Sequence, residues 1–258
     1  MSAPTSGSAP ALAVRGLGHA FGGLRVLDGV DFSVAPGQIT GLIGPNGSGK
    51  STCFNIVSGF LRAQRGQVLL HGADIAGLQV HERCAAGMVR TFQTPKVFGH
   101  LTVLDNLRSG SHRLGRSGWL ANLLQTAQAR RDLAQATERA LAVAQWFELT
   151  PLLHTVAGVL PAGQQRLVEM ARALASEPSL LMLDEPSSGL SAGEIAQLRE
   201  RIVAVRERGI SVLLVSHDLG LAAVARQVHV LCFGRIVASG DMAEVQDDPQ
   251  VRKAYLGV

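Results

Sequence analysis

A glycine-rich segment carries the residue types that hold phosphate groups in proteins: Gly44, Pro45, Asn46, Gly47, Ser48, Gly49, Lys50 and Ser51. It matches the P-loop pattern G-x-x-x-x-G-K-[ST] at every fixed position. An apolar run over residues 39–43, typical of a strand, precedes it, and residues 52–57 read as the start of a helix. Glycines let several backbone N–H groups and the helix N-terminus point at one anion. The sequence therefore predicts a phosphate site, with Thr52 directly after it.

Two side chains of this segment extend the prediction from phosphate to ATP and Mg²⁺. Lys50 is placed to reach the β- and γ-phosphates, and the Ser51 hydroxyl is placed to hold Mg²⁺. The alternative is an ordinary glycine-rich turn with an incidental lysine. The complete pattern between a strand and a helix favours the nucleotide site.

A second group of chemically capable residues follows the apolar run at residues 180–183. Asp184 comes directly after that run and can hold Mg²⁺ at the carboxyl edge of a sheet, although a strand-end turn aspartate is the alternative. Glu185 can polarise a water for attack on the γ-phosphorus, or it can be a surface acid. His217 follows another apolar run, and a parallel strand beside the first would bring it to the same edge.

Composition narrows the class of protein. The 258 residues carry a net charge of +4 without a lysine/arginine run, which disfavours nucleic acid as a partner. Three separated cysteines read as reduced thiols, with neither a disulfide framework nor a zinc site. No secretory signal and no run of about eighteen apolar residues is present. We expect a soluble protein whose membrane role, if any, depends on partners, and a disordered tail at residues 1–11.

The elements that must position these residues follow an α/β pattern. Strand-like runs at 13–17, 26–34 and 68–70 predict a small antiparallel β layer around the P-loop strand. From about residue 101 to 157 the pattern is helical, with Leu133, Ala136, Ala140, Leu141 and Ala144 expected on one face of a helix. Apolar strands alternating with helices then predict a parallel sheet covered on both faces. The fold class is thus an α/β P-loop NTPase core with a parallel sheet, an N-terminal antiparallel β subdomain and an inserted helical subdomain.

The motifs described above resemble those of the nucleotide-binding subunits of ATP-binding-cassette (ABC) transporters. The resemblance extends from about residue 12 to residue 258. The resemblance implies that Phe21 stacks on adenine, although a core phenylalanine is the alternative. It implies that Gln93 is a lid glutamine that contacts Mg²⁺ and senses the transmembrane partner, and that His217 is the switch histidine. It also implies a signature loop at Leu160, Pro161, Ala162, Gly163 and Gln164, and a D-loop at residues 188–191.

Further residues resemble one subfamily, the ATPases of branched-chain amino-acid importers and of their urea-transporting relatives. The resemblance rests on Arg90-Thr91-Phe92-Gln93, on residues 97–98 and 101–107, on the long stretch from 108 to 132 and on the ending Ala254-Tyr255-Leu256-Gly257. It implies a helical subdomain at about 93–165 and a family extension at about 240–258.

The sequence departs from the family at two positions that act on the partner's nucleotide. Pro161 replaces a serine that donates to the γ-phosphate held by the opposite subunit, and proline can donate from neither side chain nor backbone. A structural reading also exists, because proline suits the first turn of a helix. Ser191 replaces the usual aspartate or asparagine, and with Glu194 it forms a capping-box pattern. We expect unequal ATP sites in a heterodimer with a second cassette.

The resemblance implies an ATP-hydrolysing importer subunit for branched-chain or related amino acids, at the cytoplasmic face of the inner membrane. Its partners would be a second ABC ATPase subunit in a homo- or heterodimer, two transmembrane permease subunits and, indirectly, an extracytoplasmic solute-binding protein. The alternatives are an importer of urea or short-chain amides and a soluble, non-transport ABC ATPase. A nucleotide-dependent regulatory module with little hydrolysis is a further reading.

Overall fold

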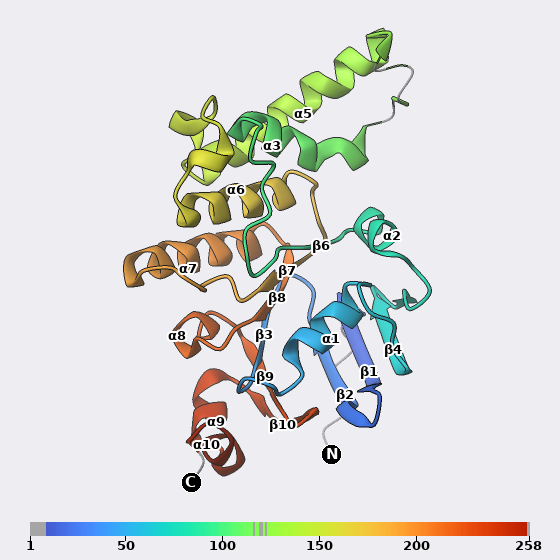
Figure 1. Cartoon of the computed structure of the whole chain (residues 1–258), viewed down its shortest axis with the longest axis vertical. Helices are drawn as coiled ribbons and strands as arrows, with labels where there is room; N and C mark the ends of the chain where they lie inside the picture. Colours follow the sequence, from blue (N-terminus) through green and yellow to red (C-terminus); the bar gives the residue numbers. More distant parts are fainter. Residues whose placement is uncertain (1–8, 116, 119–120, 122, 257–258) are drawn as a thin grey trace. The chain divides into compact units, whose positions relative to one another are not determined.

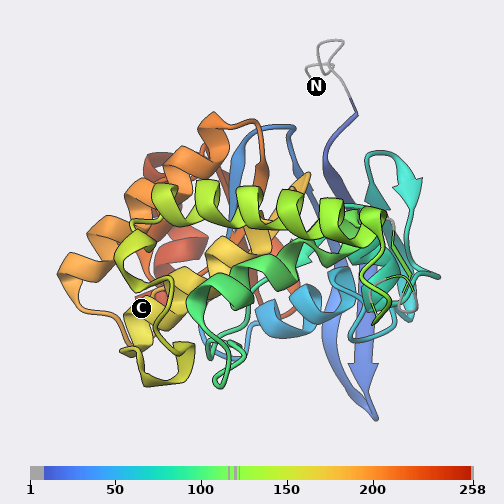
Figure 2. The same ribbon diagram turned by 90° about the horizontal axis from the view of Figure 1, so that it is seen from above.

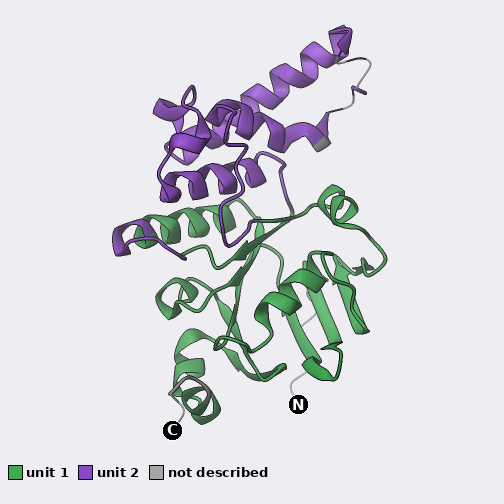
Figure 3. Cartoon of the chain, in the orientation of Figure 1, with its two compact units in different colours: residues 1–90, 179–187, 195–258 green, residues 91–178, 188–194 purple. Residues whose placement is uncertain are grey.

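The computed structural model describes residues 9–256 except 116, 119, 120 and 122. The chain divides into two compact units, coloured separately in Figure 3. Unit 1 contains Met1–Arg90, Ser179–Ser187 and Ile195–Val258, and unit 2 contains Thr91–Pro178 and Ser188–Glu194. Figure 1 labels most of the helices and strands of the chain.

Unit 1 opens with the expected antiparallel sheet. Its strands lie in the order β2-β1-β4-β5, with the bounds β1 (Leu12–Phe21), β2 (Leu24–Val34), β4 (Arg65–Leu70) and β5 (Ala73–Asp74). In β2, buried Val30, Phe32 and Val34 alternate with exposed residues, because successive side chains of a strand point to opposite faces. The prediction of an N-terminal β layer is confirmed. Residues 1–8 of the predicted tail lie outside the described residues, while Ala11 is buried and its carbonyl accepts from the His71 N–H (3.0 Å).

The second sheet of unit 1 has the order β10-β9-β3-β8-β7-β6. All neighbours are parallel except β9 and β10. Every residue of β3, β7 and β8 is buried, as expected for strands covered on both faces. The bounds are β3 (Ile39–Ile43), β6 (Met88–Arg90), β7 (Leu180–Asp184), β8 (Ser211–Val215), β9 (Gln227–Cys232) and β10 (Arg235–Gly240). The predicted parallel sheet is therefore present.

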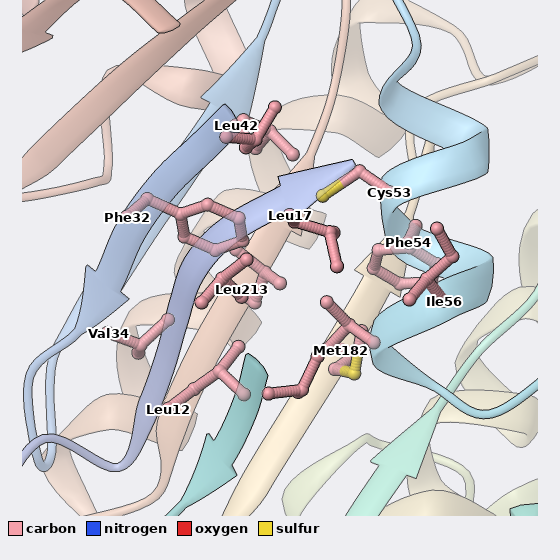
Figure 4. Close-up of a cluster of buried hydrophobic side chains, with 14 of the residues drawn as sticks. Leu12, Leu17, Phe32, Val34, Leu42, Cys53, Phe54, Ile56, Met182 and Leu213 are labelled. Atoms are coloured by element: carbon pink, nitrogen blue, oxygen red, sulfur yellow. The ribbon is translucent and has the colours of Figure 1, made fainter. Parts of the chain in front are cut away.

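The core of unit 1 determines where the P-loop helix lies. Cys53, Phe54 and Ile56 of α1 (Lys50–Val57) pack into a cluster that also takes side chains from both sheets (Figure 4). The N-terminus of α1 is thereby fixed to the sheets. The other helices of unit 1 are α2 (Val80–Ala85), α8 (Leu219–Ala222), α9 (Met242–Asp247), α10 (Pro249–Leu256) and the part of α7 (Ala192–Glu207) from Ile195 onward. Gly257 of the quoted C-terminal ending lies outside the described residues.

Unit 2 is helical in its described residues. Helix α3 (Val103–Gly110) packs against α5 (Ala127–Trp146) and α6 (Ala162–Leu174), and α3 and α5 lie side by side in Figure 2. Thr102 and Thr126 begin α3 and α5 by accepting backbone N–H groups with their hydroxyls. Three short 3₁₀ turns also lie among its described residues: η1 (Ser111–Leu114), η2 (Thr150–Leu152) and η3 (Ala157–Val159). The unit continues past residue 165, the expected end of the helical subdomain, through α6.

The predicted face of α5 (Ala127–Trp146) is only partly buried. Ala140 and Ala144 are fully buried, but Leu133 and Leu141 are 57% and 44% exposed. Leu133 borders an open hollow of about 260 Å³, and Leu141 is turned about 100° from its neighbour Ala140 along the helix. Small alanines at the contact positions allow close helix packing, and the leucines lie beside that contact. No helix in the described part of the chain has the length and apolarity to cross a membrane.

Candidate nucleotide-binding site

The predicted P-loop connects β3 to α1, as the pattern requires. Gly49 is the N-cap residue of α1 and has a left-handed φ of 105°, which favours glycine. A Cβ on Gly49 would lie 2.8 Å from Leu27 Cδ2 and 2.9 Å from the Val26 carbonyl oxygen. A Cβ on Gly44 would overlap the Leu231 carbonyl. The loop is therefore packed so closely against Val26, Leu27 and Leu231 that glycine is needed at positions 44 and 49.

Several features of this loop fit a polyphosphate. The first turn of α1 contains no acidic residue, so the positive end of the helix dipole is not neutralised there. The Lys50 ammonium donates to the carbonyl oxygens of Gly44 (2.7 Å) and Pro45 (3.0 Å). The buried Ser48 hydroxyl has no hydrogen-bond partner among the described residues. The cradle thus presents donors and positive charge to an anion.

Burial lowers the pKa of Lys50, and the nearby Glu185 and Asp184 carboxylates oppose that shift. Only 7% of Lys50 is exposed, so the desolvation of its ammonium is the largest cause. Phosphate oxygens bound in the loop would add further negative charge close to this ammonium group. Ser51 follows Lys50 in the first turn of α1 and is exposed.

The second predicted cluster lies at the carboxyl ends of β7 and β8, which are parallel neighbours with Asp184 opposite Val215. Glu185 donates its backbone N–H to the Val215 carbonyl (2.8 Å) and has a left-handed φ of 45°. The His217 N–H donates to Glu185 Oε2 (3.1 Å), and His217 Nδ1 lies 2.6 Å from the same oxygen. The structure therefore brings Glu185 and His217 together, as the strand order predicts.

Asp184 has a partner that the sequence did not indicate. Arg90, the last residue of β6, donates from Nη2 to Asp184 Oδ2 at 3.0 Å. Both side chains are nearly buried, at 10% and 12% exposure. Oxygen atoms of a carboxylate and of a hydroxyl are the ligands that Mg²⁺ takes in such sites, so Asp184 and Ser51 are chemically suited to it.

Phe21 ends β1 with 52% of its surface exposed, so the alternative of a core phenylalanine is wrong. Its ring makes an edge contact with His19, with ring centroids 4.6 Å apart. The exposed face is compatible with stacking. Gln93 belongs to unit 2, where its side chain is exposed and its carbonyl oxygen accepts from Arg166 Nη2 (2.6 Å).

The predicted signature loop leads into α6. Pro161 is the N-cap residue, one position before the first helical residue Ala162, and it forms no side-chain cap. The expectation that it occupies the first helical turn is thus off by one position. Gly163 lies against the Glu194 carboxylate, since a Cβ there would overlap Glu194 Oε1. Gln164 is half-buried in the first turn of the helix.

The structural reading of Ser191 is confirmed. The Ser191 N–H and hydroxyl donate to Glu194 Oε2 at 2.8 and 2.7 Å, and the Glu194 N–H donates back to the hydroxyl. The Ser191 hydrogen bonds lower the pKa of Glu194, so this carboxylate stays ionised beside Gly163.

Buried charges on α6 bind the backbone of the segment that contains Gln93. Arg166 donates to the carbonyl oxygens of Phe92 (2.9 Å) and Gln93 (2.6 Å). Glu169 Oε1 accepts the N–H groups of Phe92 (3.4 Å) and Lys96 (3.0 Å). Burial raises the pKa of Glu169, and these N–H groups and two arginines oppose the shift. Within unit 2, the segment from Phe92 to Lys96 is therefore fixed to the helix that follows the signature loop.

Sequence reasoning missed the roles of Arg90, Arg166 and Glu169. The sequence feature that could have pointed to two of them is a charged residue next to apolar ones. Arg166 and Glu169 lie on a helix beside Leu167, Val168 and Met170.

Comparisons with known proteins agree with the geometry. The family model "ABC transporter" matches residues 27–188, and "Branched-chain amino acid ATP-binding cassette transporter" matches residues 235–258. The chain is similar to the high-affinity branched-chain amino acid transport ATP-binding protein BraF of Pseudomonas aeruginosa, with 40% identity across 97% of this chain and 99% of the relative. It is 37% identical to LivG of Escherichia coli K12, which has the same description, with the same coverage.

A solved structure, the ADP conformation of an ATP-binding cassette of an ABC transporter, superposes with a TM-score of 0.83. It is 33% identical, and the match covers 96% of this chain and 99% of that one.

Proposed function

The chain belongs to the ABC transporter family and is an ATP-binding cassette ATPase, and from this premise we propose that it powers uptake of a branched-chain or related amino acid. The observation that carries the nucleotide chemistry is the P-loop, with its buried Lys50 ammonium at the uncompensated N-terminus of α1. The observation that supports the solute is the match of residues 235–258 to the branched-chain amino acid model, together with the names of the relatives.

The proposed ATP contacts follow from the two clusters of unit 1. Backbone N–H groups of the loop from Gly44 to Thr52, except Pro45, which has none, and the Lys50 ammonium bind the β- and γ-phosphates, and Phe21 stacks on adenine. Ser51 and Asp184 would hold Mg²⁺, and Gln93 of unit 2 is proposed as a further ligand on the family resemblance alone. When bound, Mg²⁺ neutralises charge on the phosphate oxygens.

Hydrolysis is assigned to Glu185 and His217. Glu185 accepts a proton from the attacking water, and His217 orients the Glu185 carboxylate through Oε2. The left-handed backbone of Glu185 and its N–H bond to Val215 fix where its side chain starts. Because Oε2 contacts His217, Glu185 can approach the water through Oε1.

We further propose that the cassette dimerises head-to-tail with a second ATPase subunit. Pro161, Ala162, Gly163 and Gln164 then face the nucleotide on the partner's P-loop. Pro161 lacks the hydroxyl donor, and the ionised Glu194 lies beside Gly163, so this surface is less favourable for a γ-phosphate. In a heterodimer the site on this chain's own P-loop is the more active one.

Replacing Pro161 with serine tests that asymmetry. Pro161→Ser supplies one hydrogen bond to a charged group, an effect of about 1.5–3 kcal/mol. The complex is assembled with this chain carrying Glu185→Gln, which inactivates the ATP site on its own P-loop. Adding Pro161→Ser to this chain should then raise the ATPase activity that remains, which comes from the site on the partner's P-loop. Unchanged turnover in that complex would contradict the proposal.

The transport assignment is tested in cells that lack their own branched-chain amino-acid uptake. The chain is expressed together with two permease subunits, a solute-binding protein and a second cassette from the same genome. We propose that in this complex it is bound peripherally at the cytoplasmic face of the inner membrane. Uptake of radiolabelled leucine that is lost with Lys50→Ala supports the proposal. Uptake of urea or a short-chain amide instead, or ATPase activity that never depends on permeases, would replace it with one of the two alternatives.

A further inference from the structure

We propose that Arg90 is a positioning residue that fixes the Asp184 carboxylate relative to the helix that carries Ser51. The inference rests on the proposed function, because Asp184 and Ser51 are the two unit 1 side chains assigned to Mg²⁺. It adds a residue that touches neither nucleotide nor metal and that acts through Asp184.

The contacts of Arg90 are numerous for one side chain. Nη2 donates to Asp184 Oδ2 at 3.0 Å, and Nη1 donates to Asn55 Oδ1 (2.9 Å) and to the Ser58 hydroxyl (2.7 Å). The guanidinium also lies over the rings of Phe54 and Phe60, 4.7 and 4.8 Å from their centroids. A planar guanidinium presents its donors in a fixed fork, so these acceptors determine its orientation.

Helix geometry connects these contacts with the metal ligands. Asn55 lies four residues after Ser51 on α1, so the two side chains share one face of the helix. One end of the Arg90 guanidinium therefore holds the helix face that bears Ser51, and the other end holds the carboxylate that ends β7. Mg²⁺ requires near-octahedral geometry with short bonds, so the spacing of its ligands decides how well it binds.

A second arginine of unit 1 provides the contrast. Arg83 is also buried and also binds α1, donating from Nη1 to the carbonyl oxygens of Ile56 (2.8 Å) and Val57 (2.6 Å). Among the described residues, the hydrogen bonds of the Arg83 side chain all go to backbone carbonyls, and none involves Asp184. A general loss of packing around α1 would therefore follow from changing either arginine, whereas a change in the metal ligands would follow from Arg90 alone.

The test measures metal dependence of nucleotide binding in the full chain, using a non-hydrolysable ATP analogue and isothermal titration calorimetry. The native protein, Arg90→Lys and Arg83→Lys are each titrated over a series of Mg²⁺ concentrations and in EDTA. Lysine keeps the charge but has one ammonium in place of the fork. We expect Arg90→Lys to raise the half-maximal Mg²⁺ concentration about tenfold, the equivalent of one charge-assisted hydrogen bond. Affinity in EDTA should be unchanged, and Arg83→Lys should leave the Mg²⁺ midpoint unchanged.

An equal shift in both variants, or no shift in either, overturns the proposal. If Arg90→Lys does not fold, Asn55→Ala decides, because it removes one α1 acceptor and leaves the Arg90–Asp184 pair in place. A rise of about threefold in its Mg²⁺ midpoint supports the proposal, and an unchanged midpoint overturns it. If the native protein itself binds the analogue without any dependence on Mg²⁺, the proposed function fails before the question of Arg90 arises.

Discussion

Replacing Arg166 with lysine should lower the stability of unit 2 far more than a surface substitution of the same type. Arg166 is 2% exposed and donates to the carbonyl oxygens of Phe92 and Gln93 at 2.9 and 2.6 Å. A single lysine ammonium at that depth can replace one of these hydrogen bonds, which leaves the other carbonyl without its charged donor. A hydrogen bond to a charged group contributes about 1.5–3 kcal/mol, so the free energy of unfolding should fall by about 2 kcal/mol.

The assay uses tryptophan fluorescence, because both tryptophans fall between positions 91 and 178 of the sequence and Trp146 ends α5 of unit 2. Urea unfolding followed by tryptophan fluorescence therefore reports on this unit. The matched control is Arg139→Lys, because Arg139 pairs with Glu177 (2.8 Å) on the surface of the same unit, where such pairs contribute about 0–1 kcal/mol. If both variants shift the urea midpoint equally, the reasoning that buried donors fix the Gln93 segment is refuted.

Three further outcomes are expected. Glu185→Gln should retain ATP binding and lose at least about a hundredfold in ATPase turnover, measured under single-turnover conditions; full turnover would remove Glu185 from its assigned role. Burial raises the pKa of the Cys53 thiol to about 12 from 9.0, so it stays protonated in the folded state while the unfolded thiol ionises. Stability should therefore fall as pH rises from 9 towards 12, and Cys53→Val should reduce that slope in urea titrations; an identical slope would contradict it. Gly49→Ala should destabilise the fold by more than about 2 kcal/mol, because Gly49 has a left-handed φ and the new Cβ would meet Leu27 and the Val26 carbonyl. The control is Gly193→Ala in α7, where the new Cβ has open space, and it should stabilise the fold by about 0.5–1 kcal/mol. Melting temperatures distinguish the two.

Local patterns made much of unit 1 predictable. The P-loop is a contiguous pattern, and β3, β7 and β8 are contiguous apolar runs, so both are visible without knowledge of the fold. The approach of His217 to Glu185 followed from strand order alone, because parallel neighbours end at one edge.

What remained invisible depends on contacts between distant parts of the chain. Arg90 and Asp184 are 94 residues apart, and Arg166 and Phe92 are 74 apart, so no spacing rule connects them. The exposure of Leu133 has the same origin, since helical periodicity predicts a shared face but not which part of it meets a neighbour.

The chain passes between the two units four times, after Arg90, Pro178, Ser187 and Glu194. Two of these passages adjoin the nucleotide chemistry: Arg90 binds Asp184, and Ser187 follows Glu185 by two residues. Unit 2 is consequently not a detachable domain, since excising it would require cutting the chain close to Asp184 and Glu185. A force applied to unit 2 would enter unit 1 through the backbone at the ends of β6 and β7, beside Asp184 and Glu185, the residues proposed to bind Mg²⁺ and to polarise water.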